Sequence, residues 1–223
     1  MRKQELAKLI DHTALGPVVG EARVEELCGE AIRHGFAAVC IPPTHVALAA
    51  GLLQGESPVV CVVVGFPHGQ HTPEVKAFEA RSAIGEGAGE VDMVINVAAL
   101  KEGDYARVSA EIRAVREALE KAAQRPVLKV ILECPLLEDR EKTAGAILAQ
   151  AAGADFVKTS TGFGPGGATV EDVGLLRQAV APHVGVKAAG GIGDYETALR
   201  MVEAGANRLG ASRSVAILEA ATD

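Results

Sequence analysis

The chain has 223 residues, of which 48% are hydrophobic and 3% aromatic, and its formal net charge is −7. This length and apolar content suit one globular domain, because a single α/β barrel needs about 250 residues, so we expect residues 1–223 to form a single domain. The net negative charge argues against nucleic acid as a partner, since nucleic-acid binders present basic faces.

The lengths of the apolar stretches and the spacing of the cysteines bear on membrane association, on cellular location and on bound metal or disulfides. The longest apolar stretch, Pro58 to Gly65, has the length of a strand and is too short to cross a bilayer, and the basic N-terminus lacks the apolar run of a signal peptide. We therefore expect a cytoplasmic protein with no membrane partner. The four cysteines form no CxxC pair and the histidines show no metal-ligand spacing, so neither a disulfide nor a bound metal is expected.

Strand-like and helical segments alternate along the whole chain. A short amphipathic helix, roughly Lys3 to Leu9, precedes a first strand at Leu9 to Thr13, and a helix follows from Glu21 to Arg33. Several later helices end in a similar Ala-Gly-Ala or Ala-Gly-Glu, which indicates a repeated βα unit. The remaining strands are expected at 37–41, 59–64, 90–96, 127–133, 155–160, 185–190 and 207–212, with helices such as Pro73–Gly87, Tyr105–Ala123 and Glu138–Ala152 between them.

Eight strands alternating with helices favour either a closed barrel or a doubly wound open sheet. No GxGxxG motif follows the first strand, and the glycine-rich stretches lie late in the chain. Both facts favour a (β/α)8 TIM barrel of the α/β class with a short extra N-terminal helix. Its functional side chains are expected near the carboxyl ends of the strands.

The strands carry charges on one side only. Alternate side chains of a strand face opposite sides, and in the strands around positions 92, 129, 158 and 187 one of the two sides is apolar throughout. Because helices cover the outside of a barrel, the polar side of each strand must face the interior. Five charged residues are therefore expected to meet inside the barrel, namely Asp11, Asp92, Lys129, Lys158 and Lys187.

Two interpretations fit this interior charge. Charges buried without partners are costly, so the first is a structural ion-pair network in which Asp11, Asp92 and Glu133 balance the lysines, with Glu133 as the partner of Lys129. The second is covalent catalysis, because a lysine forms a Schiff base only when its amine is neutral. Burial and a neighbouring cation both lower the amine pKa from its ordinary value near 10.4, and a carboxylate such as Asp92 can move protons.

Glycine-bearing segments follow the last three predicted strands, at 161–167, 190–193 and 210–212. Phosphate commonly binds barrels at the loops after strands seven and eight, where glycine lets the backbone N–H groups approach closely. Each loop alone also fits an ordinary turn. Together, at one end of the barrel, they predict a phosphate site.

The motifs around these positions resemble those of the deoxyribose-phosphate aldolase family. That resemblance implies reversible cleavage of 2-deoxy-D-ribose 5-phosphate to D-glyceraldehyde 3-phosphate and acetaldehyde, in deoxynucleoside breakdown and without a metal or organic cofactor. The partners would be this small phosphorylated sugar and acetaldehyde, and an exposed apolar helix face would suit a homodimer or homotetramer. The matching segments span nearly the whole chain in order: LIDHT (9–13), AAVCIPP (37–43), VVVGFPHG (62–69), EVDMVIN (90–96), LKVILE (128–133), DFVKTSTGFGPGGAT (155–169), VKAAGGI (186–192) and LGAS (209–212).

The resemblance also implies a role for each site residue. Lys158 would carry the Schiff base, Lys187 would be the second lysine that perturbs it, and Asp92 would relay protons. The remaining implied positions are Lys129 as support for this network; Asp11, Thr13 and Cys40 at the border of the substrate, with simple packing an equal alternative for Cys40; and Gly162, Gly190, Gly191, Gly210 and Ser212 around the phosphate.

Two positions depart from the pattern. Arg213 follows Ser212 where some relatives have a second serine, and the chain ends in Ala-Thr-Asp where some relatives end in a tyrosine, so proton transfer must rest on Asp92, lysine and water. Two alternatives stay open. One is another Schiff-base aldolase or transaldolase with a different donor; the other is a phosphosugar-binding barrel whose lysines only hold anions.

Overall fold

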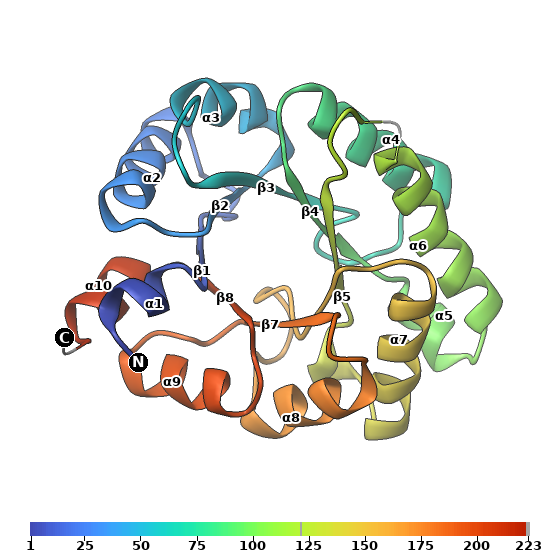
Figure 1. Cartoon of the computed structure of the whole chain (residues 1–223). Helices are drawn as coiled ribbons and strands as arrows, with labels where there is room; N and C mark the ends of the chain where they lie inside the picture. Colours follow the sequence, from blue (N-terminus) through green and yellow to red (C-terminus); the bar gives the residue numbers. More distant parts are fainter. Residues whose placement is uncertain (121, 222–223) are drawn as a thin grey trace.

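Eight parallel strands close into a barrel in the order β1 to β8, with β8 hydrogen-bonded back to β1 (Figure 1). We describe it from a computed structural model, which describes residues 1–120 and 122–221. The predicted (β/α)8 TIM barrel is confirmed. Its strands are β1 Ile10–Thr13, β2 Ala38–Ile41, β3 Val59–Val64, β4 Glu90–Val94, β5 Val127–Ile131, β6 Phe156–Lys158, β7 Gly185–Ala189 and β8 Arg208–Ala211.

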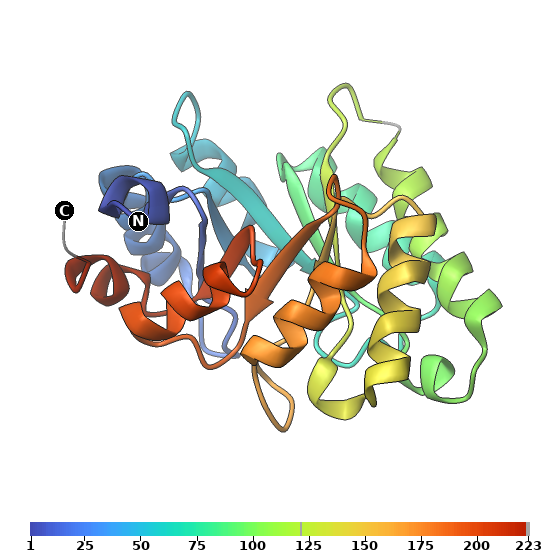
Figure 2. The same cartoon turned by 60° about the horizontal axis from the view of Figure 1, so that its bottom comes forward.

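Helices surround the barrel on all sides, and the predicted extra N-terminal helix is present. This helix, α1, packs beside α10, so that both ends of the described chain lie on the same side of the molecule (Figure 2). No helix of the described ranges is long and apolar enough to span a membrane. The helices are α1 Lys3–Ala7, α2 Glu21–His34, α3 Val46–Leu52, α4 Pro73–Gly85, α5 Val97–Lys101, α6 Tyr105–Leu119, α7 Asp139–Ala151, α8 Val170–Ala179, α9 Tyr195–Glu203 and α10 Ser214–Glu219, with short 3₁₀ turns at Pro43–His45 and Cys134–Leu136.

Several strands are shorter than the sequence pattern indicated. The predicted strands 90–96 and 127–133 end at Val94 and Ile131, and the residues beyond them start new elements. Asn96 caps α5 by accepting a hydrogen bond from the backbone N–H of Ala99 at 3.0 Å. Glu133 adopts the left-handed conformation, with φ 59°, where the following 3₁₀ turn begins. The helix predicted over 105–123 ends at Leu119, and its predicted residue 121 lies outside the described residues.

The main core lies between the outer face of the barrel and the helices. Val91 and Met93 of β4, for example, are fully buried there, and Asp92 between them faces the interior. The register pairs Asp92 with Lys129 and Lys158 with Lys187 on neighbouring strands, so the predicted alternation of inward and outward side chains is confirmed. The positions of these charged interior side chains are therefore fixed by strand geometry rather than by loops.

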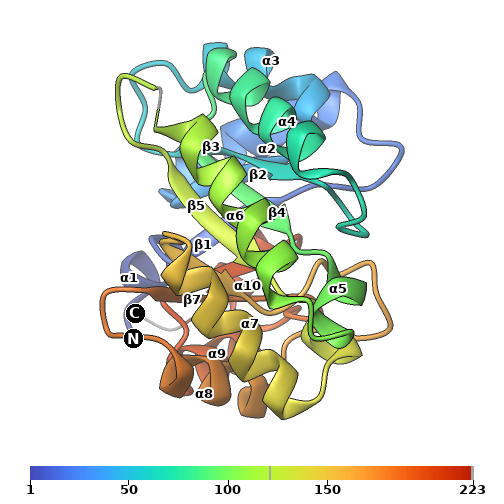
Figure 3. The ribbon, with the colours of Figure 1, turned by 90° about the vertical axis from the view of Figure 1, so that its right-hand side faces the viewer.

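Helices α4 and α6 lie side by side on one flank of the barrel (Figure 3) and form the most extensive helix–helix contact of the described chain. Between them Lys76 Nζ donates to Glu111 Oε2 at 2.8 Å, and both side chains are fully buried. A buried ion pair of this kind specifies how two helices pack more than it adds net stability, because desolvation offsets the attraction.

Candidate active site

The predicted interior charges converge on one carboxylate. Lys158 Nζ and Lys187 Nζ both donate to Asp92 Oδ2 at 2.7 Å, and Lys129 Nζ donates to Asp92 Oδ1 at 2.8 Å. Asp11, the fifth predicted residue, accepts a hydrogen bond from Lys187 through its Oδ2 atom. The structure thus brings all five of these residues together inside the barrel.

Two further charged residues complete the network and were missed from the sequence. Arg208 Nη1 lies 2.6 Å from Asp11 Oδ1 and 3.1 Å from Glu90 Oε2, and Lys129 Nζ lies 2.5 Å from Glu90 Oε2. Strand alternation indicates the inward face for both. Glu90 is two residues before Asp92 and so faces the same side of β4, and Arg208 precedes Leu209 of β8, which packs in the outer core; their contact across the barrel does not follow from either segment.

The expected pairing of Glu133 with Lys129 is wrong. The strand ends at Ile131, so the alternation cannot be extended to position 133. Glu133 Oε2 instead accepts from the backbone N–H of Thr161 at 3.1 Å, and the side chain lines a neighbouring cavity of about 630 Å³. Glu90 is the third carboxylate of the interior network, in the place that the sequence interpretation gave to Glu133.

Cys61 also belongs to the interior network. Its Sγ donates to Asp92 Oδ1 at 3.2 Å and lies 3.2 Å from Lys129 Nζ, which donates to it. Burial is the main reason that the pKa of this thiol is well above its ordinary value, so it remains a hydrogen-bond donor. Cys40 lies directly opposite on the neighbouring strand and is fully buried.

The electrostatics of the network separate Lys158 from the other lysines. Burial disfavours the charged form of every group in the network. At Asp92 the attraction of the neighbouring cations is stronger than this effect, so the pKa of its carboxyl is well below the ordinary value. At Lys129 and Lys187 burial is likewise outweighed, by Asp92 and Asp11, so the pKa of both amines is raised and both stay charged. Each of these two amines contacts at least two carboxylates, whereas Lys158, among the described residues, pairs with the carboxylate of Asp92 alone.

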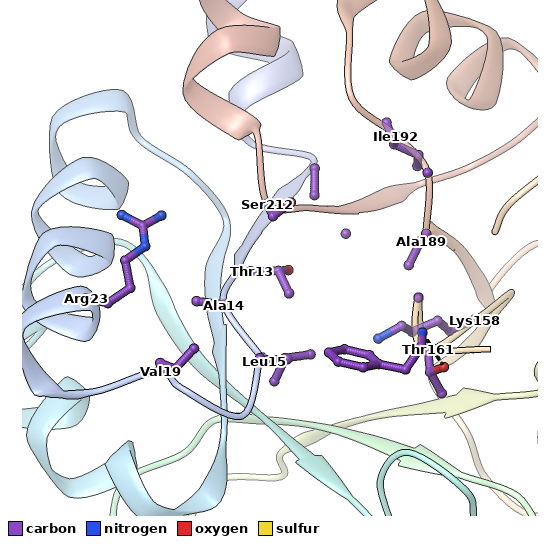
Figure 4. A pocket seen from close by; sticks show the side chains of 17 residues that line it. Thr13, Ala14, Leu15, Val19, Arg23, Lys158, Thr161, Ala189, Ile192 and Ser212 are labelled. Atoms are coloured by element: carbon purple, nitrogen blue, oxygen red, sulfur yellow. Dashed lines mark hydrogen bonds between the residues drawn. The ribbon is translucent and has the colours of Figure 1, made fainter. Parts of the chain in front are cut away.

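Lys158 is also the interior lysine that reaches open space. A cavity of about 400 Å³ lies at the carboxyl end of the barrel, with Lys158 in its lining, while Asp92, Lys129 and Lys187 lie beneath it. Figure 4 shows Lys158 and Thr161 on one side of the cavity and Thr13 and Ser212 across from them. The expected border residue Thr13 therefore lines the cavity, whereas Cys40 and Asp11 do not.

All five residues of the predicted phosphate site line this same cavity: Gly162, Gly190, Gly191, Gly210 and Ser212. Gly190 adopts φ 91°, and a Cβ there would lie 2.9 Å from the backbone of Gly167, so this close approach of two loops requires glycine. A Cβ at Gly210 would meet Lys187 Cε at 3.3 Å. At these glycines the wall of the cavity is therefore formed by backbone atoms instead of side chains.

Two arginines lie around the cavity. Arg23, which the sequence interpretation did not select, lines the outer part of the cavity (Figure 4). It donates through Nη1 to Glu26 at 2.6 Å and Glu30 at 3.2 Å. Arg213 is exposed and does not line the cavity, but a Cβ at Gly193 would lie 3.6 Å from its Nη1 atom. Its guanidinium therefore lies against the loop that follows β7.

Two groups of interior side chains have the spacing of metal ligands among the described residues: Cys40, Cys61 and Asp92, and Asp11, Cys61 and Glu90. Their carboxylates already accept from lysine or arginine, so a cation bound there would displace an ammonium or guanidinium group against like charge. The chemistry of the donors therefore fits a metal poorly, and the expected absence of a metal or organic cofactor stays a prediction.

Comparisons with known proteins agree with this geometry. Residues 6–220 match the model of a family described as "DeoC/LacD family aldolase". The chain is 54% identical over 219 residues to a deoxyribose-phosphate aldolase of Clostridium perfringens, covering 98% of this chain and 96% of the relative, and 53% identical to a deoxyribose-phosphate aldolase of Bacillus licheniformis, covering 98% and 97%. A tetrameric deoxyribose phosphate aldolase from Aeropyrum pernix superposes with a TM-score of 0.87 at 36% identity, over 97% of this chain and 91% of that one.

Proposed function

The chain belongs to the DeoC/LacD family of aldolases, and from this premise we propose that it reversibly cleaves 2-deoxy-D-ribose 5-phosphate to D-glyceraldehyde 3-phosphate and acetaldehyde through a Schiff base on Lys158. The observation that carries this proposal is the position of Lys158. It is the lysine that lines the cavity, it has one carboxylate partner at 2.7 Å, and its strand neighbour Lys187 stays charged beside it.

The first step follows from this arrangement. The ammonium of Lys187 and the ammonium of Lys158 share Asp92 Oδ2, so protonation of both is disfavoured and Lys158 loses its proton the more readily. The neutral amine then adds to the C1 aldehyde of the open-chain sugar. Asp92 takes up and returns the protons needed to expel the hydroxyl of the carbinolamine as water.

The iminium formed in this way acts as an electron sink for cleavage of the C2–C3 bond. Loss of the proton from the C3 hydroxyl releases glyceraldehyde 3-phosphate and leaves an enamine on Lys158. Protonation at C2 and hydrolysis then release acetaldehyde and restore the amine. Because Asp92 lies beneath the cavity, water carries protons between it and the substrate carbon, and Lys129 and Cys61 hold the carboxylate in place.

The phosphate of the substrate is assigned to the glycine loops after β6, β7 and β8. Backbone N–H groups at Gly190, Gly191 and Gly210, with the Ser212 hydroxyl, suit a group that needs several donors at close range. Thr13 lies across the cavity from Lys158 (Figure 4), and we assign it to contact with the sugar hydroxyls. Cys40, beneath the cavity, supports the barrel interior under this assignment.

The wider setting is part of the same proposal. We assign the enzyme to deoxynucleoside breakdown in the cytoplasm, as one domain that spans the chain. Val75 and Phe78 on α4 are exposed, Phe78 by 61%, and such an apolar helix face supports a homodimer or homotetramer. The tetrameric Aeropyrum pernix relative is in line with this assignment.

The proposal is tested by incubating the protein with deoxyribose 5-phosphate and following glyceraldehyde 3-phosphate and acetaldehyde separately. Equal release of both supports it. A second assay, self-condensation of acetaldehyde, separates this activity from that of another aldolase or transaldolase on the same scaffold, because few such enzymes use so small a donor. A phosphosugar-binding barrel would release neither product from deoxyribose 5-phosphate. The Lys158→Ala variant should bind the sugar phosphate and lose cleavage.

A further inference from the structure

The charged and titratable side chains around Lys158 come from every strand of the barrel other than its own, β6. The three carboxylates among them face three lysines and one arginine, so the interior carries one cation more than its carboxylates balance. The pKa of the Cys61 thiol is raised mainly by burial, and that of Cys40 is lowered mainly by its neighbour Cys61. The full set is Asp11 on β1, Cys40 on β2, Cys61 on β3, Glu90 and Asp92 on β4, Lys129 on β5, Lys187 on β7 and Arg208 on β8.

Arg208 is the cation that makes this excess. Its guanidinium lies 2.6 Å from Asp11 and 3.1 Å from Glu90, and it lies over the ring of Phe156, 5.5 Å from the centroid. Arg208 is next to Lys187 in the strand register and lines neither of the two cavities, so it does not touch a substrate bound there. A guanidinium stays protonated at all ordinary pH values, so its charge is permanent.

Asp11 connects this charge to the reactive lysine. It accepts from Arg208 through Oδ1 and from Lys187 through Oδ2. Because Arg208 already balances Asp11, the charge of Lys187 is not cancelled there and acts on Lys158 across the Asp92 oxygen that the two lysines share. Without Arg208, Asp11 would neutralise Lys187 more completely.

We propose that Arg208 and Glu90 are an opposed pair of positioning residues at the floor of the barrel, which together set the pH at which Lys158 becomes a nucleophile. Arg208 moves that pH to lower values and Glu90 moves it to higher values. The consequence for the reaction rests on the proposed Schiff base at Lys158, whereas the effect on the amine itself does not.

The test measures the Lys158 amine directly. Competitive labelling with acetic anhydride across pH, followed by peptide mapping, gives the pH midpoint of Lys158 without any substrate. In Arg208→Gln the midpoint should rise, by about one pH unit if the removed charge acts over about 10 Å at an effective dielectric of about 20. In Glu90→Gln it should fall, and in the double variant it should return close to the parent value.

Matched controls separate charge from folding. Arg208→Lys keeps the cation and should keep the midpoint within a few tenths of a pH unit, and the same series in a Cys40→Ala background should give the same directions of shift. An unchanged midpoint in Arg208→Gln, or shifts of the same sign in both single variants, overturns the proposal. In a separate experiment, the parent protein is treated with acetaldehyde and borohydride, and the adduct on Lys158 is measured. A missing adduct refutes the proposed function, whereas the acetic anhydride series still decides the role of Arg208.

Discussion

Replacing Lys187 by leucine removes the cation that shares the Asp92 oxygen with Lys158. Each of the two amine nitrogens lies 2.7 Å from Asp92 Oδ2, so they are separated by no more than twice that distance. At about 5 Å and an effective dielectric of about 20, two unit charges repel by about 3 kcal/mol, which corresponds to about two pH units. The pH profile of Schiff-base trapping at Lys158 should therefore move to higher pH by up to about two units.

The variant should still fold, because Arg208 continues to pair with Asp11 and Lys129 continues to pair with Asp92. The assay is borohydride reduction in the presence of acetaldehyde at a series of pH values, with the labelled peptide quantified at each. Lys187→Arg keeps a cation and should keep the profile close to that of the parent. A profile that does not move in Lys187→Leu would leave burial as the sole cause of reactivity and would refute the charge argument.

Three further changes test other parts of the structure. Ser212→Asp places a negative charge beside the proposed phosphate, so KM for deoxyribose 5-phosphate should rise tenfold or more if the repulsion exceeds about 1.4 kcal/mol, with slow cleavage of unphosphorylated deoxyribose unchanged, and equal loss on both substrates would refute the phosphate assignment. Arg213→Ala is the control, because this exposed arginine does not line the cavity, and it should barely change the kinetics. Activity should survive EDTA, and loss that zinc restores would indicate a metal-dependent reaction. Lys76→Met leaves the buried Glu111 with only the more distant Arg107, at 3.6 Å, and should cost up to about 3–5 kcal/mol in denaturant unfolding, whereas Lys76→Met with Glu111→Leu should be nearly neutral, and an equal cost in both would contradict the ion-pair argument.

Strand alternation was sufficient to predict the interior of the barrel. Asp92, Lys129 and Lys158 lie on strands whose opposite faces are apolar, and a two-residue period leaves no other side for their charges. The alternation fails as soon as a strand ends. Glu133 shows this, because its left-handed backbone turns the side chain toward Thr161 instead of Lys129.

Partners that depend on closure of the barrel were harder to predict. Arg208 and Glu90 meet across the interior from strands four apart in the order, and no local pattern in either segment indicates the contact. Arg23 reaches the cavity from a helix, where the sequence pattern indicates only a solvated face. The five phosphate-site residues, by contrast, follow the ends of strands, and the cavity that joins them is where the topology of a barrel places it.

The most direct test of the proposed mechanism is the location of the covalent adduct. The protein is treated with acetaldehyde and borohydride, digested, and its lysine-containing peptides are compared by mass spectrometry with those of the Lys158→Ala variant. The proposed mechanism predicts an ethyl group on Lys158 in the parent and none on any lysine of the variant. An ethyl group on Lys129 or Lys187 instead, or undiminished labelling in the variant, would contradict the assignment of Lys158 as the nucleophile.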